Sequence, residues 1–175
     1  MKDKASVIQT ERLQLRSFEE KDLDAAIRIF VNDEVKQTYM LPDFSDREAA
    51  QKLFERLRQL SLEKDRFVYG IYRDDTLVGF MNDVERKNTT IELGYVIHPD
   101  HKSRGYATEA LRAAIEELFC IGYTVVKTGA FQQNAASIRV MQKSGMILTD
   151  ETEELEYRGK IHTCIYYAKR KDDKA

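Results

Sequence analysis

YVIHPDHKSRGYATEA, residues 95–110, decides the fold of this chain, because a strand, a polar loop and a helix follow one another within it. Tyr95 and Ile97 continue an apolar alternation that starts at Ile91, which predicts a half-buried strand. The next residues, 101–105, are polar and include a glycine, which predicts a loop. Apolar residues then return at helical spacing, which predicts a helix directly after the loop.

The junction between this loop and the helix is suited to hold a phosphate. Gly105 allows the backbone to approach a ligand closely, and Ala107 is small. The first amides of a helix have no partner within the helix, and the helix dipole favours an anion there. Lys102 and Arg104 add positive charge at the same place. A tight turn with solvated charges would have the same sequence, since a single glycine is a weak motif.

Three strands precede the loop. The segments 67–71, 77–84 and 91–97 carry alternating apolar residues, and short polar turns join them. Short turns connect antiparallel neighbours, so we expect an antiparallel group of strands here.

The N-terminal part of the chain predicts one strand and two helices. Residues 10–16 alternate as a strand does, and an apolar stripe along residues 23–30 indicates a helix. Ser45 and Glu48 have the spacing of a capping box, which predicts a second helix with Ser45 as its cap. The buried face of this second helix is expected to consist of Ala49, Leu53, Leu57 and Leu60.

The C-terminal part alternates strands with a helix. A strand at 125–130, a short helix at 135–143 and two final strands around Ile147 and residues 161–167 are expected. A crossover helix between two strands predicts one parallel pair inside a mostly antiparallel sheet. The predicted fold is therefore a mixed α/β sandwich with helices on both faces of the sheet.

Length and composition indicate one globular domain. The chain has 175 residues, of which 42% are hydrophobic, and it contains no internal repeat and no linker rich in proline, glycine or serine. We expect a single domain over residues 1–175, with its core at about residues 7–168 and a frayed, charged tail at 169–175.

Charge and cysteine usage exclude several kinds of partner. The 28 basic and 30 acidic residues give a net charge of −2, so no global positive field would hold nucleic acid. No apolar run is long enough to span a membrane, and the polar N-terminus predicts no secretory signal. Cys120 and Cys164 are expected to be reduced and buried, and no spacing indicates a metal site. We therefore expect a cytoplasmic protein.

Several segments carry a resemblance to a known family. Residues 102–110 resemble the acetyl-CoA pyrophosphate loop of the GNAT acetyltransferases, which has the form Gln/Arg-x-x-Gly-x-Gly/Ala. Residues 10–16 and 91–95 are similar to segments of the RimJ/RimL-like branch of that family. Residues 134–137 and 141–146 resemble the second cofactor motif of the same branch. These landmarks occur in the family's order over about residues 7–168.

The resemblance implies acetyl transfer from acetyl-CoA to an amine. In this family the fourth strand, here ending at Ile97, separates from the fifth, and pantetheine lies between them. Amides near Ile97 would then hold the thioester carbonyl. Lys102 stands where the family more often has glutamine or arginine, but backbone amides make most of the contacts in such a loop. Cofactor contacts are thus expected at Ile97, Lys102, Ser103, Arg104, Gly105, Tyr106, Ala107 and Asn134.

Two glutamates are candidates for the general base, because an alkylammonium with a pKa of about 10 must lose a proton before it attacks. Glu92 is polar within an apolar strand, so burial should raise its pKa, and its position resembles a strand glutamate that serves as base in several family members. Glu156 resembles the position of a proposed active-site glutamate in the RimL-like branch. Either residue could instead be a surface carboxylate.

Ser137 is the candidate general acid for the leaving thiolate, since it lies near the start of the short helix where a hydroxyl can face the sulfur. It could equally be a helix-capping serine. Many members of the family use a tyrosine, and Tyr166 or Tyr167 could replace Ser137 in that role.

The acceptor is expected to be the α-amine of a protein N-terminus or the amine of a small molecule. Acidic residues at 150–156 could attract a cationic acceptor. A module that binds acyl-CoA without turnover is the alternative function. A homodimer is the default oligomer.

Overall fold

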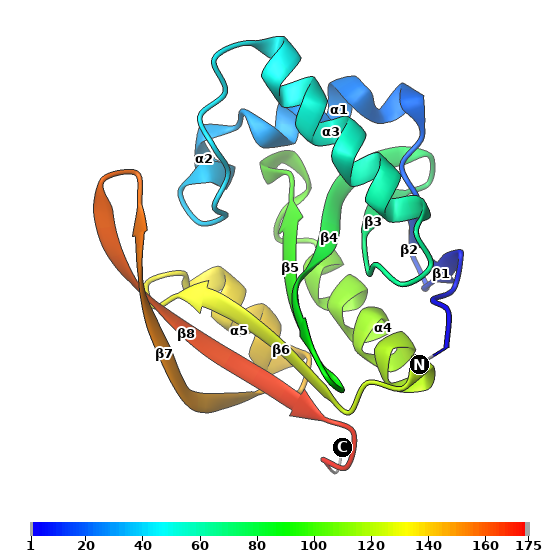
Figure 1. The fold of residues 1–175 in the computed structure, drawn as a ribbon, viewed down its shortest axis with the longest axis vertical. Coiled ribbons are helices and arrows are strands. Elements are labelled where there is room, and N and C mark those ends of the chain that lie inside the picture. The colour runs from blue at the N-terminus through cyan, green and yellow to red at the C-terminus, as the bar shows by residue number, and fades with distance from the viewer. Residues whose placement is uncertain (1, 174–175) are drawn as a thin grey trace.

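The computed structural model describes residues 2–173, which form one mixed sheet with helices on both faces (Figure 1). The strands are β1 (Val7–Gln9), β2 (Leu13–Arg16), β3 (Tyr69–Arg73), β4 (Thr76–Lys87), β5 (Thr90–Ile97), β6 (Val125–Phe131), β7 (Ile147–Tyr157) and β8 (Lys160–Arg170). The α-helices are α1 (Leu23–Phe30), α2 (Asp33–Lys36), α3 (Arg47–Leu62), α4 (Tyr106–Ile121) and α5 (Ala135–Lys143).

The eight strands lie in the order β1-β2-β3-β4-β5-β6-β8-β7. Strands β5 and β6 are parallel, because helix α4 forms the crossover between them, and the other neighbours in the sheet are antiparallel. The predicted fold class is therefore confirmed, including its single parallel pair.

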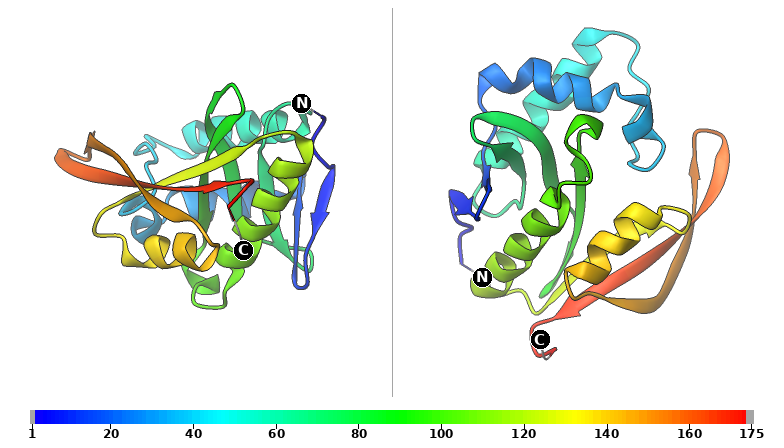
Figure 2. Two further views of the ribbon diagram at one scale, coloured as in Figure 1. Left: turned by 90° about the horizontal axis from the view of Figure 1, so that it is seen from below. Right: turned by 180° about the vertical axis from the view of Figure 1, so that it is seen from behind.

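Two hydrophobic cores lie on opposite faces of the sheet. Helices α4 and α5 cover one face, where Leu111 and Met141 are buried against residues of the central strands. Helices α1 and α3 cover the other face, where Phe30 and Phe54 are buried. Figure 2 shows the two helix layers on either side of the strands.

The N-terminal strand was predicted as one segment, and this prediction is wrong in its extent. The chain forms a hairpin instead, in which β1 pairs with β2 and the residues around Thr10 make the turn. The Thr10 amide donates to the carbonyl of Leu13, and the Thr10 hydroxyl accepts from the Leu13 amide, which closes the turn. The hairpin adds a strand, so that the strand predicted as the fourth is β5.

Helix α3 differs from its prediction in its cap and its buried face. Asp46, not Ser45, is the N-cap, because its carboxylate accepts from the Ala49 amide at 2.8 Å. Leu57 is buried as predicted, but the other buried residues are Ala50, Phe54 and Ser61, while Leu53 and Leu60 are only partly buried against the same core. Phe54 decides the orientation, because its large ring fills the core beneath the helix.

Two predictions about the C-terminal part and the cysteines also need correction. Lys169 and Arg170 end strand β8, and the Lys171 amide donates to the carbonyl of Thr124, so this part of the tail is tied to the sheet rather than frayed. Lys174 and Ala175 lie outside the described residues. Cys164 is buried as expected, but Cys120 is exposed because it lies on the outer face of α4.

Candidate active site

The site is built around the point where β5 and β6 separate. The two strands pair from Thr90 with Val125 to Glu92 with Lys127, and the pairing ends there. Strand β5 continues to Ile97 beside β4, and β6 continues to Phe131 beside β8. Beyond Glu92 one edge of β5 therefore has no neighbouring strand among residues 2–173, as the resemblance implied.

The backbone of Ile97 faces this open edge. The His98 amide donates to the Val78 carbonyl on the β4 side at 2.8 Å. Amides of successive residues in a strand point to opposite edges, so the N–H of Ile97 points away from β4, toward the side of β6. This is the donor position that was predicted for a thioester carbonyl.

Helix α4 begins close to the end of β5 with a row of unpartnered amides. The backbone has positive φ at Ser103 (59°) and at Gly105 (81°), which curls the loop before the helix. Within the described part of the chain, no hydrogen bond is formed by the amides from Ser103 through Thr108. Such a row of donors at a helix start is suited to an anion such as a diphosphate.

Arg12 and Glu109 brace this loop from the N-terminal hairpin. The Glu109 carboxylate accepts from the Arg12 Nε at 2.7 Å, from the Arg12 amide at 2.8 Å and from the Thr10 hydroxyl at 2.6 Å. The Arg12 Nη1 donates to the Arg104 carbonyl at 2.9 Å, and its guanidinium lies over the Tyr106 ring. The hairpin thus holds the loop without occupying its amides.

Two predicted cofactor residues have partners of their own in the protein. The Lys102 Nζ lies 2.5 Å from Glu34 Oε1 on helix α2, so its charge is paired at the surface. Asn134 is the N-cap of α5 and accepts from the Ser137 amide through its side-chain oxygen at 3.1 Å. Asn134 therefore performs the capping role that had been the alternative for Ser137.

The hydroxyl of Ser137 lies 2.9 Å from the hydroxyl of Tyr95. Burial raises the pKa of Tyr95 to about 12, partly offset by this hydrogen bond, so Tyr95 is neutral at pH 7. Tyr95 packs with Leu93 and Ile97 on the α4 side of the sheet. The pair is a proton-bearing group next to the open edge of β5.

Glu92 lies on the other face of β5, at the point of separation. Its side chain is 14% exposed, and its Oε2 lies 3.3 Å from the Nζ of Lys127. Burial raises the pKa of Glu92 above its usual value even though Lys127 pulls it down. The predicted rise is thus confirmed, and a half-desolvated carboxylate of this kind is suited to accept a proton.

Glu156 does not lie with Glu92. Along β7 the side chains of Glu151 and Glu153 face β6 and β8, where they bind Lys127 and Tyr166. Glu154 binds Thr163 from the opposite face, and Glu156 follows it on that face with its side chain exposed.

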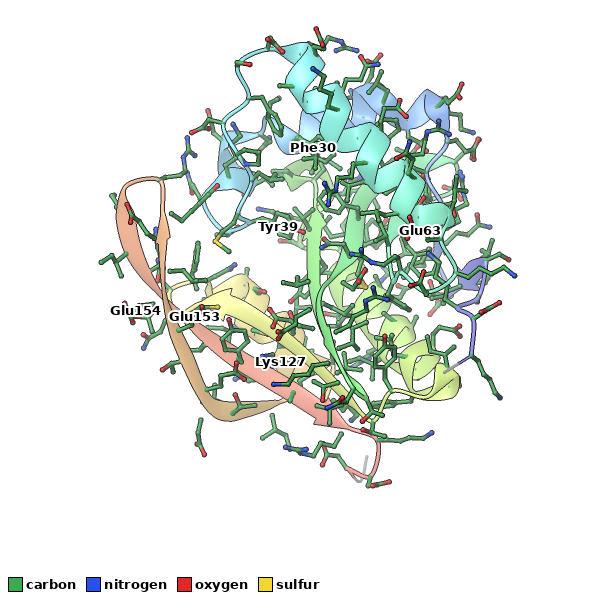
Figure 3. The ribbon with its side chains drawn as sticks, in the orientation of Figure 1. Phe30, Tyr39, Glu63, Lys127, Glu153 and Glu154 are labelled. Atoms are coloured by element: carbon green, nitrogen blue, oxygen red, sulfur yellow. The ribbon has the colours of Figure 1, made fainter. Side chains whose placement is uncertain are left out.

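The two tyrosines proposed as alternative acids are also separated. Tyr166 donates to Glu153 Oε2 at 2.8 Å on the face that carries Glu92. Tyr167 is on the α5 side, where its hydroxyl accepts from Gln142. Figure 3 shows Lys127 below Tyr39, with Glu153 and Glu154 on the side of the β7–β8 hairpin.

The tip of the β7–β8 hairpin reaches the segment after α2. The Tyr157 hydroxyl accepts from the Leu41 amide at 3.3 Å and lies within hydrogen-bond distance of the carbonyls of Tyr39 and Leu41. Arg158 pairs with Asp43 at 3.4 Å beside it. These contacts link the β7–β8 hairpin to the segment that follows α2.

Gly94 leaves room for the Tyr39 hydroxyl on the face of β5 that carries Glu92. A Cβ at Gly94 would lie 3.2 Å from the Tyr39 hydroxyl, which donates to Asn82 Oδ1 at 2.5 Å. A larger residue would push Tyr39 away from Asn82, so the glycine supports this polar contact.

The arrangement can move a proton on each side of β5. Glu92 can accept one on the face of α1 and α3, and the Tyr95–Ser137 pair can supply one on the face of α4 and α5. The Ile97 amide lies two residues beyond Tyr95 at the open edge of β5, and the free amides of α4 follow it along the chain. Together they fit attack of a nucleophile on an activated carbonyl whose carrier bears phosphates.

Sequence reasoning missed four contributors to the site, namely Arg12, Tyr95, Lys127 and Tyr157. Arg12, Lys127 and Tyr157 act through partners that are distant in the sequence. For Tyr95 a signal existed, because it is an aromatic residue with a polar end in the strand beside the loop.

No group of three or more His, Cys, Asp or Glu residues within 2–173 is arranged to hold a metal ion. In the same part of the chain no helix is both long and apolar enough to cross a bilayer.

The chain is similar to known acetyltransferases. Residues 12–147 match the family model described as acetyltransferase (GNAT) domain. YoaA of Bacillus subtilis (strain 168), an uncharacterized N-acetyltransferase, is 31% identical over 145 residues, which are 79% of this chain and 81% of YoaA. A GNAT-family acetyltransferase from Bacillus anthracis has the same fold with a TM-score of 0.83 at 22% identity, over 95% of this chain and 99% of that one. RimL, a ribosomal L7/L12 alpha-N-protein acetyltransferase solved with coenzyme A, gives a TM-score of 0.82 at 17% identity, over 94% and 97% of the two chains.

Proposed function

The chain belongs to the GNAT family of acetyltransferases, and on that premise we propose that it transfers an acetyl group from acetyl-CoA to a primary amine. The acceptor is the α-amine of a protein N-terminus or the amine of a small molecule. The observation that carries the proposal is the separation of β5 from β6 next to the unpartnered amides that open α4.

The residues at the start of α4 fit acetyl-CoA. Donors from Ser103 through Thr108 are available for its diphosphate, and Gly105, which adopts a positive φ, has no side chain to obstruct them. Arg104 adds charge, and Asn134, whose side-chain oxygen caps α5, is the proposed contact for the pantetheine arm. Acetyl-CoA supplies the activated carbonyl and a thiolate leaving group.

The chain's own groups then provide the proton transfers. Glu92 removes a proton from the ammonium group of the acceptor, directly or through water. The Ile97 amide donates a hydrogen bond to the carbonyl oxygen. The Ser137 hydroxyl, hydrogen bonded to Tyr95, donates to the leaving sulfur.

We assign proton abstraction to Glu92 rather than to Glu156, because Glu156 is exposed on the far face of β7. Glu92→Gln removes the base without changing the size of the side chain. We expect kcat/KM at pH 7 to fall about 100-fold or more, in the range of general-base catalysis. Glu156→Gln is the matched comparison, and a loss in Glu156→Gln with no loss in Glu92→Gln would return the assignment to Glu156.

Of the possible acceptors, we propose the N-terminus of a peptide as the preferred one. RimL shares the fold and is described as acting on the α-amine of a ribosomal protein. Glu151 and Glu153 of β7 lie on the face that carries Glu92, and their negative charge would attract an ammonium group. Polyamines and amino acids are the competing acceptors.

Release of free thiol from acetyl-CoA tests the proposal. The protein is incubated with acetyl-CoA and a set of peptides with free N-termini, the same peptides with acetylated N-termini, polyamines and amino acids. We expect amine-dependent thiol release and a product heavier by one acetyl group. Thiol release that does not depend on any amine would contradict the proposal.

A further inference from the structure

Lys127 is a buried charge with two acidic partners at the point where β5 and β6 separate. It lies directly opposite Glu92 in the last pair of the parallel ladder, and its side chain is 14% exposed. Its Nζ is 3.3 Å from Glu92 Oε2 and 2.8 Å from Glu151 Oε1. The same Nζ lies 4.4 Å from the centre of the Tyr166 ring.

This geometry leaves Lys127 few other arrangements. The neighbouring β6 residues place its backbone in the ladder, and the ring of Tyr166 covers its ammonium group. Burial alone would lower the pKa of Lys127, but the hydrogen bond to Glu151 and the charge of Glu92 outweigh it, so the pKa lies above its usual value. The lysine is therefore charged at every pH at which the enzyme would be assayed.

We propose that Lys127 is a positioning residue for the reaction, which holds the Glu92 carboxylate where β5 and β6 separate and ties it through Glu151 to strand β7. The inference rests on the proposed function in one respect, namely that Glu92 is the base. It adds a residue that touches neither acceptor nor acetyl-CoA.

The groups around Glu92 come from each neighbouring strand. Lys127 on β6 is its cation, and Glu85 on β4 and Glu151 on β7 repel its charged form. On β8, the charge of Glu92 contributes to the raised pKa values of Tyr166 and Cys164. The Tyr166 hydroxyl donates to Glu153. Without the lysine, Glu92 would face carboxylates and neutral groups, so its proton would bind more tightly.

Lys127→Met tests the proposal, because methionine keeps the length and removes the charge. The titration of the Glu92 side chain is followed by NMR with carbon-13-labelled glutamate, and Glu92→Gln identifies the signal. We expect the midpoint to rise by about one pH unit in Lys127→Met, as loss of an opposite charge at this distance implies. Lys127→Arg retains the charge and should stay near the wild-type midpoint.

The pH profile of kcat/KM gives the second readout. The kcat/KM of Lys127→Met should be about tenfold below that of the wild type at low pH. The difference should shrink as pH rises, because Glu92 in the variant ionises at a higher pH. The pKa of the acceptor amine appears in both profiles and does not move. Lys52→Met removes a comparable lysine–glutamate pair from the exposed surface of α3 and should leave titration and profile unchanged.

Two results would overturn the proposal. One is a Glu92 midpoint in Lys127→Met that equals the wild-type value, and the other is a loss of activity that is uniform across pH and is not restored by arginine. The NMR titration needs no turnover, so it decides the role of Lys127 even if no acceptor is acetylated. If no acceptor is acetylated but the Glu92 midpoint rises as expected in Lys127→Met, the result counts against the proposed function and not against the pairing of Lys127 with Glu92.

Discussion

Ser137 and Tyr95 show how a residue's partner decides its role. Ser137 was a plausible cap by its position in the sequence, but Asn134 takes the cap and leaves the serine hydroxyl to Tyr95. A hydroxyl released from capping can turn toward a leaving group. The hydroxyl of Ser137 is free for this role because Asn134, three residues earlier, accepts the hydrogen bond from the Ser137 amide and caps the helix.

Replacing Ser137 by alanine should slow turnover by about tenfold to a hundredfold, because the variant lacks the hydroxyl that we propose as donor to the leaving sulfur. The KM for acetyl-CoA should change little. Steady-state kinetics at saturating acceptor measure this, with Ser45→Ala as the matched control on an exposed hydroxyl. A turnover number unchanged in Ser137→Ala would move the donor role to Tyr95 alone.

Glu109 should make stability depend on pH in acid. Burial by itself would raise its pKa, but hydrogen bonds from Thr10 and Arg12 outweigh this and place it below the usual value of 4.5. A carboxylate with a lowered folded-state pKa contributes its full stabilisation above pH 4.5 and loses it as pH falls through the folded value.

The comparison of wild type with Glu109→Gln tests this dependence. We expect the wild type to be more stable by about 1–3 kcal/mol at pH 7, as for a hydrogen-bonded charge. The difference should shrink below pH 4.5 in urea unfolding curves. A constant difference from pH 7 to pH 3 would show that the carboxylate charge does not contribute.

At the residue scale, the sequence predicted what depends on local alternation. The raised pKa of Glu92 follows from a polar residue in an apolar strand, and the structure agrees. Lys127 could not be found this way, because its pairing with Glu92 exists only once α4 has brought β6 beside β5. The sequence pointed to the carboxylate that we propose as base, but not to the cation beside it.

At the element scale, the α4 junction combines a glycine conformation with free amides. Gly105→Val would force a branched residue into φ of +81°, which costs about 1–2 kcal/mol in the left-handed region. We expect the loop to change conformation and coenzyme A affinity to fall at least tenfold. Isothermal titration calorimetry measures the affinity.

Gly159→Val is the control for this prediction, because Gly159 also has positive φ (71°) and lies in the β7–β8 turn, away from the loop. A similar loss of affinity in both variants would indicate general destabilisation. Unchanged affinity in Gly105→Val would remove the α4 amides from the cofactor site.

Elements were predictable where a local cap or stripe defines them. Helix α5 was expected at residues 135–143 and has those bounds, since its boundaries follow a strand and a polar turn. The face of α3 was predicted only in part, because both of its sides carry apolar residues: Leu57 is buried as expected, whereas Phe54, which the predicted stripe left out, is also buried in the core. The β1–β2 turn was missed because it contains no glycine or proline.

At the scale of the whole molecule, the β7–β8 hairpin and the segment after α2 are distant in sequence and joined by Tyr157. Tyr157→Phe removes the acceptor of the Leu41 amide and should cost about 1 kcal/mol. Hydrogen exchange of the segment around Leu41 should become faster. Tyr167→Phe, on the opposite face of β8, should leave that exchange as it is in the wild type.

The sequence predicted the sheet, its parallel pair and the open edge of β5, because periodicity and the family resemblance both bear on chain order. It could not predict the link through Tyr157, whose hydroxyl meets backbone groups rather than a complementary side chain. Contacts of this kind have no pattern in the sequence of either segment.

The link through Tyr157 has a consequence for the turnover rate of the enzyme. It consists of a hydroxyl bound to backbone, at about 1 kcal/mol per hydrogen bond, and an exposed Arg158–Asp43 pair that adds little. A link of about 1–2 kcal/mol is open in roughly one molecule in ten, and segment motions of this size take microseconds to milliseconds. Typical enzymes turn over at about 10 per second. The link therefore opens many times in each catalytic cycle. Its opening would not limit the rate at which a bulky acceptor such as a polypeptide end is acetylated.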